Sequence, residues 1–293
     1  MDLKKNKVLY LFVLPGLILY SIFFIYPTLS ALFYSFTDWD GLTPQYNFVG
    51  VDNYINIFTN DSIFIKAFGN NLKFMLFVVI FQTAFSLLFA LYLVKNTKTN
   101  ILLRALYFFP TILSSVSVAF IWSFVYDPSL GILNTLLEKA NLEFLTYNWL
   151  GDQDIAIFSI AVVQVWMHTG QMLIIFVAGL QNIPNDLYEV AKIEGASKWQ
   201  RFRFVTWPLV APAATIVVAY TTIQSFKAFD LIFAMTRGGP NYATEILATL
   251  IYSTAFQSFK FGYASAESVI FMIVIAIITI LQFKVLRSDR AAG

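Results

Sequence analysis

The feature that most constrains this chain is a series of six long apolar stretches. One helix that crosses a bilayer needs about 20 mostly apolar residues. Stretches of that length lie at about 8–36, 71–94, 105–126, 155–180, 208–229 and 264–286. With 58% hydrophobic and only 12% charged residues, a soluble domain could not cover its surface with polar groups. The sequence therefore predicts an all-α polytopic membrane protein, with six transmembrane helices in a single domain over residues 1–293.

The basic residues predict how these spans are oriented. They gather at the N-terminus, in two of the connections and in the tail: Lys4, Lys5 and Lys7; Lys95, Lys98 and Arg104; Lys192, Lys198, Arg201 and Arg203; Lys284, Arg287 and Arg290. Because Lys and Arg are enriched in cytoplasmic loops, both termini and the 183–207 connection are expected in the cytoplasm. The first apolar run is longer than a signal-peptide core and lacks an Ala-x-Ala site, which favours an uncleaved span.

Several classes of function are excluded by what the sequence lacks. It contains no cysteine, so thiol catalysis, cysteine-ligated metal and disulfides are ruled out. A net charge of +2 is too small to indicate a nucleic-acid partner. No G-x-x-x-x-G-K-[ST] run is present, so the chain cannot hold ATP in a P-loop. We expect no catalysis by this chain, and no cofactor or metal of its own.

The connection between residues 183 and 212 is too polar to cross a membrane, yet it has an apolar face. Pro184 can start a helix, Asp186 lies near its positive end, and Leu187 and Val190 fall on one side. Gly195 permits a sharp turn before a basic, aromatic segment. Two interpretations remain open from the physics: a hairpin lying on lipid, with Lys198, Arg201 and Arg203 facing anionic headgroups, or a knob of two short helices that docks on a partner.

Two spans carry stripes of uncharged polar residues at helical spacing. Gln164, His168 and Gln171 follow i, i+4, i+7 in the fourth span, and Thr221, Gln224 and Ser225 follow i, i+3, i+4 in the fifth. A lone histidine is usually a hydrogen-bonded bundle residue, and nothing here has metal-ligand spacing. Polar side chains are costly against lipid, so these stripes should face other helices or a wet cavity. Their lack of charge suits a neutral, hydroxyl-rich solute.

Two further polar features lie in the second and third spans. Gln82 and Ser86, one helical turn apart, either join helices or edge a solute path. Pro110 removes a backbone hydrogen bond, and the serines that follow it can satisfy the freed groups, which predicts a kink. Such a kink serves either as a gate or as a packing device.

Glu189-Val190-Ala191, followed by Gly195-Ala196, Phe202 and Trp207-Pro208, resembles the EAA loop of ABC importer permeases. The chain departs from that pattern with Val190 in place of the first alanine. The resemblance implies the type I importer fold, with residues 183–207 as a cytoplasmic coupling loop that fits a groove on an ATPase and Glu189 meeting a basic group there. The coupling residues that it implies are Asp186, Leu187, Glu189, Ala191, Gly195, Ala196 and Phe202.

Two external segments narrow the resemblance. Phe48-Val49-Gly50 with Asp52-Asn53-Tyr54 is similar to the first external loop of sugar-type permeases, and the segment from Phe229 to Thr244 resembles the last external loop of the maltose and glycerol-phosphate types. This implies that His168, Gln171, Thr221, Gln224 and Ser225 face the solute, although their side chains differ from the maltose type. Gln164, on the same stripe as His168 and Gln171, is added to these candidate substrate contacts. It also implies that Gly238, Gly239 and Pro240 contact the solute-binding protein; alone they would indicate an ordinary turn.

The expected function is the permease subunit of a binding-protein-dependent ABC importer that moves a sugar or oligosaccharide by ATP-driven alternating access. The implied location is the inner membrane of a bacterium or archaeon. The implied partners are a second, homologous permease subunit in a heterodimer, two cytoplasmic ABC ATPases that hold ATP-Mg, an extracellular or periplasmic solute-binding protein, and membrane lipid. Alternatives are import of glycerol phosphate or another polar solute, an ion-coupled secondary transporter, or a membrane subunit without transport.

Overall fold

The computed structural model describes residues 7–286, with side chains placed for residues 12–285. Lys4, Lys5, Arg287 and Arg290, which entered the orientation argument, lie outside the described residues. Within them there is no strand, only an isolated antiparallel bridge between Thr37 and Phe48, so the predicted all-α class is confirmed. The described residues divide into unit 1, within Met1–Ser62 and Ile251–Ile273, and unit 2, within Ile63–Leu250 and Val274–Gly293.

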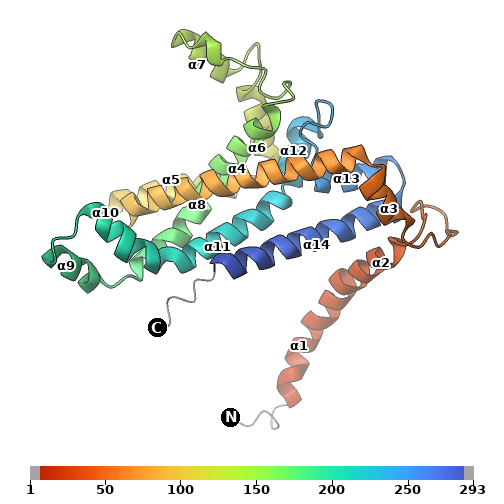
Figure 1. Cartoon of the computed structure of the whole chain (residues 1–293), viewed down its shortest axis with the longest axis horizontal. Helices are drawn as coiled ribbons and strands as arrows, with labels where there is room; N and C mark the ends of the chain where they lie inside the picture. The colour runs from red at the N-terminus through yellow and green to blue at the C-terminus, as the bar shows by residue number, and fades with distance from the viewer. Residues whose placement is uncertain (1–6, 287–293) are drawn as a thin grey trace. The chain divides into compact units, whose positions relative to one another are not determined.

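Five helices of the described part are long and apolar enough to cross a membrane: Phe12–Tyr34, Ser62–Leu93, Ala156–Gln181, Lys198–Phe226 and Phe261–Val285. A bent pair, α5 (Lys98–Ile112) with α6 (Ser115–Val125), makes a sixth if it counts as one span. Shorter helices occupy the connections: α3 (Asp52–Thr59), α7 (Ile132–Lys139), α9 (Asn185–Ile193), α12 (Phe229–Thr236) and α13 (Leu247–Tyr252). Figure 1 labels these elements along the chain.

Two of the predicted boundaries differ from the observed helices. Helix α4 (Ser62–Leu93) begins at Ser62 and not at residue 71. Its polar residues Asn70 and Asn71 do not interrupt the helix, because their side chains bond the main chain of residues 242 and 247. The basic segment after Gly195 is not a separate short helix: α10 (Lys198–Arg201), a π-helical turn (Phe202–Thr206) and α11 (Trp207–Phe226) form one helix of 29 residues. Pro208 lies inside this continuous helix, directly after the π-helical turn, so the hydrogen bond that its missing N–H would make is lost at a place where the helix is already irregular.

The third span is kinked as predicted, but the break lies at Leu113 and Ser114 and not at Pro110, which is still inside α5. Helix α5 ends at Ile112, Leu113 and Ser114 are extended, and α6 starts at Ser115 at an angle of 97° to α5. Figure 1 shows α6 turning away from α5 at this point. Thr111 donates a hydrogen bond of 2.7 Å to the carbonyl of Met167, which ties the end of α5 to α8 (Ala156–Gln181).

Unit 2 has two apolar clusters with a polar layer between them. One cluster is built from Phe74, Val78, Val118, Ile160, Val163, Met167, Leu231 and Ile232, among others. The second contains Ala90, Leu93, Met172, Phe176, Leu180, Val210 and Val217. Along the helices, the stretches between the two clusters contain Gln82 and Ser86 on α4, His168 and Gln171 on α8, and Thr221, Gln224 and Ser225 in the last turns of α11. Gln164 lies instead among the α8 residues of the first cluster.

Unit 1 is held together by the loop after its first helix. That helix consists of α1 (Lys7–Tyr20), a π-helical turn (Ser21–Ile25) and α2 (Tyr26–Tyr34). The buried side chain of Asn53 on α3 donates to the carbonyls of Ser35 and Thr37, both at 2.9 Å. The amide of Gly262, at the start of α14 (Phe261–Leu286), donates to the carbonyl of Trp39 at 2.8 Å. The most apolar part of Phe12–Tyr34 is unburied within the chain, as expected of a surface that lipid or another protein covers.

We expect Gly170→Ala to destabilise the chain, because a Cβ at Gly170 on α8 would overlap the main-chain carbonyl of Tyr107 on α5. Relieving that overlap must separate α5 from α8, at a cost of about 1–3 kcal/mol. Thermal unfolding of the detergent-purified chain measures the effect. The matched control is Gly69→Ala on α4, where a Cβ meets no atom within 4 Å and should be neutral or stabilising. Equal behaviour of the two variants would contradict the close packing of α5 on α8.

Candidate functional site

The polar stripe of α8, apart from Gln164, lies in the layer between the two apolar clusters. Gln164 is buried, whereas His168 and Gln171 are half-buried. Gln171 donates a hydrogen bond of 3.2 Å to the hydroxyl of Tyr220 on α11. Nδ1 of His168 is buried and has no hydrogen-bond partner among the described residues. Because Nδ1 itself is buried, only the exposed part of the half-buried imidazole makes His168 a candidate for an interaction outside this chain.

The polar stripe of α11 divides into two kinds of residue. The Thr221 hydroxyl accepts a hydrogen bond of 3.3 Å from Gln82, and Ser225 donates back to the carbonyl of Thr221 at 2.7 Å. Both are fully buried, so the chain itself covers them. Gln224 is half-buried, and its Oε1 has no partner within the described residues. The structure thus separates His168, Gln171 and Gln224, which retain access, from Gln164, Thr221 and Ser225, which pack inside unit 2.

The question left open for Gln82 and Ser86 is answered by their partners. Gln82 bonds Thr221 on α11, and Ser86 donates to the carbonyl of Thr169 on α8 at 3.0 Å. These two side chains therefore join helices. Tyr220, which the sequence analysis did not single out, belongs to the layer through its contact with Gln171. Its one signal in the sequence is its place beside Thr221 in the polar stripe.

The connection after α8 is a hairpin of α9 and α10, called here the α9–α10 hairpin (residues 184–206). Its turn follows from local signals. The amide of Ala196 bonds the carbonyl of Ala191 at 2.9 Å and that of Gly195 bonds Lys192 at 3.1 Å, while Gly195 has a φ of +74°. This is the helix stop that glycine supports. Ser197 then caps α10 together with Gln200, in reciprocal bonds of 3.2 and 2.8 Å.

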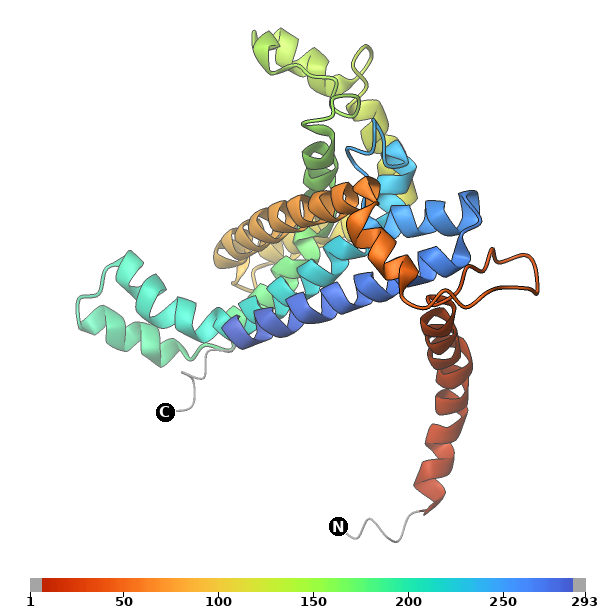
Figure 2. The same ribbon diagram turned by 45° about the vertical axis from the view of Figure 1, so that its right-hand side comes forward.

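One face of this hairpin is apolar and faces no part of unit 2. Leu187, Val190 and Ile193 are 42, 57 and 84% exposed. Glu189 and Asp186 are also exposed, whereas Ala191, Ala196 and Phe202 are half-buried. Tyr188 points the other way, with its hydroxyl 3.1 Å from that of Thr206. Figure 2 shows the hairpin projecting from the end of unit 2. Its fixed turn thus presents an apolar and acidic surface.

The predicted external contact loop is tied to the start of α4. The side chain of Asn70 donates to the carbonyls of Tyr242 and Glu245 at 2.9 and 3.0 Å, and Lys66 donates to that of Asn241 at 2.6 Å. Of the three predicted contact residues, Gly238 is buried, and Gly239 and Pro240 are half-buried. The next two residues, Asn241 and Tyr242, are exposed. The outer surface of this loop is therefore formed by residues just after the Gly-Gly-Pro run.

A buried carboxyl group lies beneath this loop. Glu245 is buried, its Oε1 has no partner among the described residues, and a Cβ at Gly238 would overlap its Oε2. Gly238 has a φ of +85°, so the position favours glycine twice, by conformation and by space. Burial raises the pKa of Glu245 above its ordinary value. No periodic pattern in the sequence marks this residue, because its burial comes from the loop and not from a helix face.

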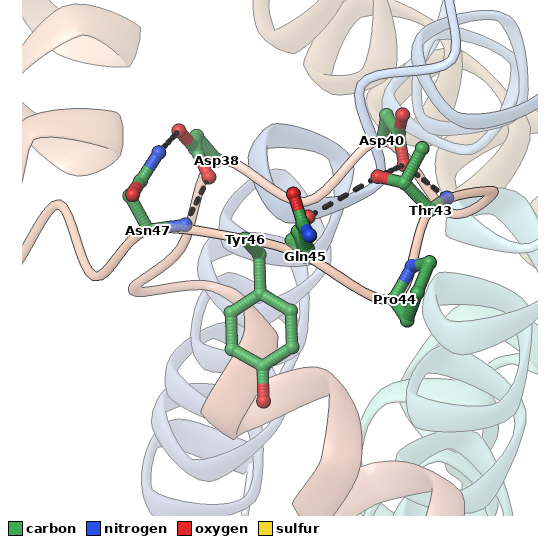
Figure 3. Close-up of a pocket in the computed structure, with 7 residues that line it drawn as sticks. All are labelled: Asp38, Asp40, Thr43, Pro44, Gln45, Tyr46 and Asn47. Carbon is green, nitrogen blue, oxygen red and sulfur yellow. Dashed lines mark hydrogen bonds between the residues drawn. The ribbon is translucent and has the colours of Figure 1, made fainter.

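A separate hollow of about 560 Å³ lies in the loop that follows the first helix of unit 1. Figure 3 shows that its two carboxylates face groups of the same loop. Asp38 accepts from the side chain and main chain of Asn47, at 2.9 and 2.6 Å, and Asp40 accepts from Thr43. These hydrogen bonds lower the pKa of Asp38 and that of Asp40. These hydrogen bonds hold the loop in one conformation, and both carboxylates accept hydrogen bonds from groups of the loop itself.

Among residues 7–286, no group of three or more His, Asp or Glu side chains is placed to hold a metal ion. The chemistry available at the polar layer is hydrogen bonding from an imidazole, amides and a phenol. Such groups can bind and release a polar solute. They offer no nucleophile with an adjacent base.

Comparison with known proteins places these features in a family. Residues 82–289 match the family model described as "Binding-protein-dependent transport system inner membrane component". The chain is 36% identical to a probable ABC transporter permease protein of Pyrococcus horikoshii and 36% identical to the multiple sugar-binding transport system permease protein MsmF of Streptococcus mutans. Each alignment covers 93% of this chain and 93% of the relative.

A solved structure has the same fold. The chain is similar to a chain in the crystal structure of a bacterial ABC transporter involved in the import of the acidic polysaccharide alginate. The TM-score is 0.84 at 23% identity, and the match covers 98% of each chain. This likeness supports the arrangement of helices described above.

The buried carboxyl at Glu245 generates a pH prediction. Its raised pKa means that its contribution to stability is full below the ordinary carboxyl pKa and is lost as pH rises through the raised value. We expect Glu245→Gln to unfold at a higher temperature than the native chain at pH 8, with the difference shrinking toward pH 4.5. Glu143→Gln, which alters an exposed carboxylate, is the control. A difference independent of pH would show that charge burial at Glu245 is not its cause.

Proposed function

Because the chain belongs to the family of binding-protein-dependent transport system inner membrane components, we propose that it is the membrane-spanning permease subunit of an ABC importer for a sugar or oligosaccharide. The names of its relatives support this class of solute, because one of them, MsmF, is a multiple sugar-binding transport system permease protein. Import of glycerol phosphate or another polar solute is the second candidate. In the described residues, α8 and the 207–226 part of α11 carry no charged side chain, which favours a neutral solute.

The observation that carries this proposal is the exposed apolar face of the α9–α10 hairpin. A fixed pair of helices with Leu187, Val190 and Ile193 facing outward, and Glu189 beside them, needs a partner to cover it. In the proposed assembly that partner is a cytoplasmic ABC ATPase. Asp186, Ala191, Gly195, Ala196 and Phe202 shape the same surface, and Glu189 meets a basic group of the ATPase.

The proposed complex contains this chain, a second homologous permease, two ATPases that hold ATP-Mg, and one solute-binding protein. Both termini and the hairpin lie on the cytoplasmic side, as the distribution of Lys and Arg favours. ATP hydrolysis takes place on the partner subunits. On the other side, Tyr242 and Asn241 extend the contact surface for the binding protein that the Gly238-Gly239-Pro240 turn initiates.

Transport in this scheme follows from ligand-driven shifts between two arrangements. Loaded binding protein and ATP-driven closure of the ATPases both favour an outward-facing state, and hydrolysis restores the inward-facing one. Each ligand shifts the equilibrium only by its difference in affinity for the two states. Solute would contact the polar layer through His168, Gln171 and Gln224, with Gln164, Thr221 and Ser225 behind them. An ion-coupled transporter is disfavoured because this layer contains no carboxylate.

The coupling role of the hairpin is tested with Glu189→Ala in the co-expressed complex. We expect solute transport and the response of ATP hydrolysis to loaded binding protein to fall at least about tenfold. The reason is that truncating one partner of an interfacial charge pair costs about 2 kcal/mol or more. ATPase assays and uptake in liposomes measure both effects.

Glu194→Ala is the matched control, since it removes an exposed carboxylate from the last residue of the same helix segment. Co-purification of the ATPase shows whether the complex assembles. Full activity in Glu189→Ala would leave the hairpin as a surface feature and overturn the coupling assignment.

The solute-facing role of the polar layer is tested by comparing residues with and without an internal partner. His168→Ala and Gln224→Ala should raise the KM for transport about tenfold, because each removes a polar group from the layer that solute would contact. Gln82→Ala should instead lower stability by about 1 kcal/mol, because its amide bonds Thr221. If His168→Ala and Gln224→Ala lose stability and keep their KM, these residues serve packing and not solute.

A further inference from the structure

A groove of about 670 Å³ runs between the end of α4 and the start of α10. One wall is apolar: Leu88 and Leu91 on α4, with Tyr92 at the mouth, are all at the chain surface. The other wall carries Lys198, Trp199 and Arg201 from the α9–α10 hairpin. Tyr92 and Trp199 are 77 and 69% exposed, so large amphipathic rings stand on both sides of the opening.

The charge on the lining is of one sign. Lys198 and Arg201 line the groove, separated by one helical turn, and no acidic residue does. Nε of Arg201 is buried and finds no acceptor within the described part of the chain. A buried guanidinium donor without an acceptor is costly, and guanidinium groups match phosphate oxygens well. The neighbouring Arg203 is exposed and does not line the groove, so these two cations are distinguished from the rest of the basic segment.

An apolar channel, aromatic rings at its mouth and two cations form the pattern of a phospholipid site. Tyr and Trp collect at the depth of lipid headgroups, and basic residues just inside the cytoplasmic surface attract anionic lipid. A free phosphate would use the cations and leave the wall formed by Leu88 and Leu91 uncovered. A lipid covers both, with its phosphodiester at Arg201 and Lys198 and an acyl chain along the leucines.

We propose that this groove binds one anionic phospholipid of the phosphatidylglycerol class, held between α4 and the α9–α10 hairpin. The assignment of this lipid to the cytoplasmic leaflet rests on the proposed function, in which the α9–α10 hairpin lies on the cytoplasmic side. The bound lipid supplies the acceptor that Arg201 lacks and bridges the hairpin to the bundle. The tilt and order of the hairpin then depend on the anionic lipid content of the membrane.

The test uses the full chain, without ATP or solute, in nanodiscs of phosphatidylcholine that contain a minor fraction of phosphatidylglycerol. Lipids retained after transfer to mild detergent are identified by native mass spectrometry. We expect retained phosphatidylglycerol to exceed its share of the mixture about fivefold or more. Arg201→Gln should lower this preference about fivefold, the contribution of one basic residue near an anionic surface, and Lys198→Gln should have a similar effect.

Arg203→Gln is the matched control and should leave the preference unchanged, while Arg201→Lys should restore part of it. Elution volume and helical content confirm that each variant is folded. If Arg201→Gln and Arg203→Gln lower the preference for phosphatidylglycerol equally, diffuse surface charge and not a defined groove attracts the lipid, and the proposed site is wrong. Displacement of the retained lipid by millimolar inorganic phosphate, or no preference in the native chain, would also overturn it. Any of these results leaves the transport proposal intact, because no step of transport enters the measurement.

Discussion

The absence of water in the hydrocarbon interior controls this structure, because every buried polar group there must find a partner inside the protein. Unit 2 meets this condition in part, through hydrogen bonds between its helices, while Oε1 of Gln82 and Oε1 of Gln282 have no partner among the described residues. Gln82 bonds Thr221, Ser86 bonds the carbonyl of Thr169, and Gln282 on α14 bonds Thr222 at 2.6 Å. Cross-helix hydrogen bonds of this kind hold α4, α8, α11 and α14 in register, and the apolar clusters fill the space on either side. Against this background, unpaired atoms such as Nδ1 of His168 and Oε1 of Gln224 are informative.

Features with a local cause were predictable from the sequence. The length of the apolar runs predicted the spans, and Pro110 predicted a kink in the third span, which is found a few residues after it. Gly195 and Ser197 predicted the turn of the hairpin. Each of these signals acts on residues within one or two turns of itself. Features that join distant segments were not predictable. Glu245 is buried by a loop that Asn70 holds from 175 residues away. Arg104 was counted as a topological charge, yet its Nε also bonds the carbonyl of Leu93 at 2.7 Å and caps the end of α4.

The candidate site shows the same division. Helical spacing placed three polar residues on each of two stripes; all of them except Gln164 lie between the stretches of α8 and α11 that belong to the two apolar clusters. Helical spacing could not reveal which residues of the stripes form hydrogen bonds within the chain. Thr221 accepts a hydrogen bond from Gln82, whereas the amide oxygen of Gln224 has no partner among the described residues. It also missed Tyr220, because its hydroxyl matters only through Gln171 on a different helix. Contact partners, which depend on three-dimensional packing, decide between a structural and a solute-binding residue.

The continuity of α10 with α11 has a mechanical consequence. Lys198–Phe226 is a single helix of 29 residues, roughly 43 Å long at 1.5 Å per residue. Its first turns carry Trp199 and Arg201, and its last turns carry Gln224. A push at one end therefore reaches the other as the motion of a stiff rod, with no chain of intermediate side-chain rearrangements. The π-helical turn at Phe202–Thr206 and the two prolines that follow it, Pro208 and Pro212, are the places where this helix can bend. Their stiffness sets how much of the push is transmitted and how much is absorbed as bending.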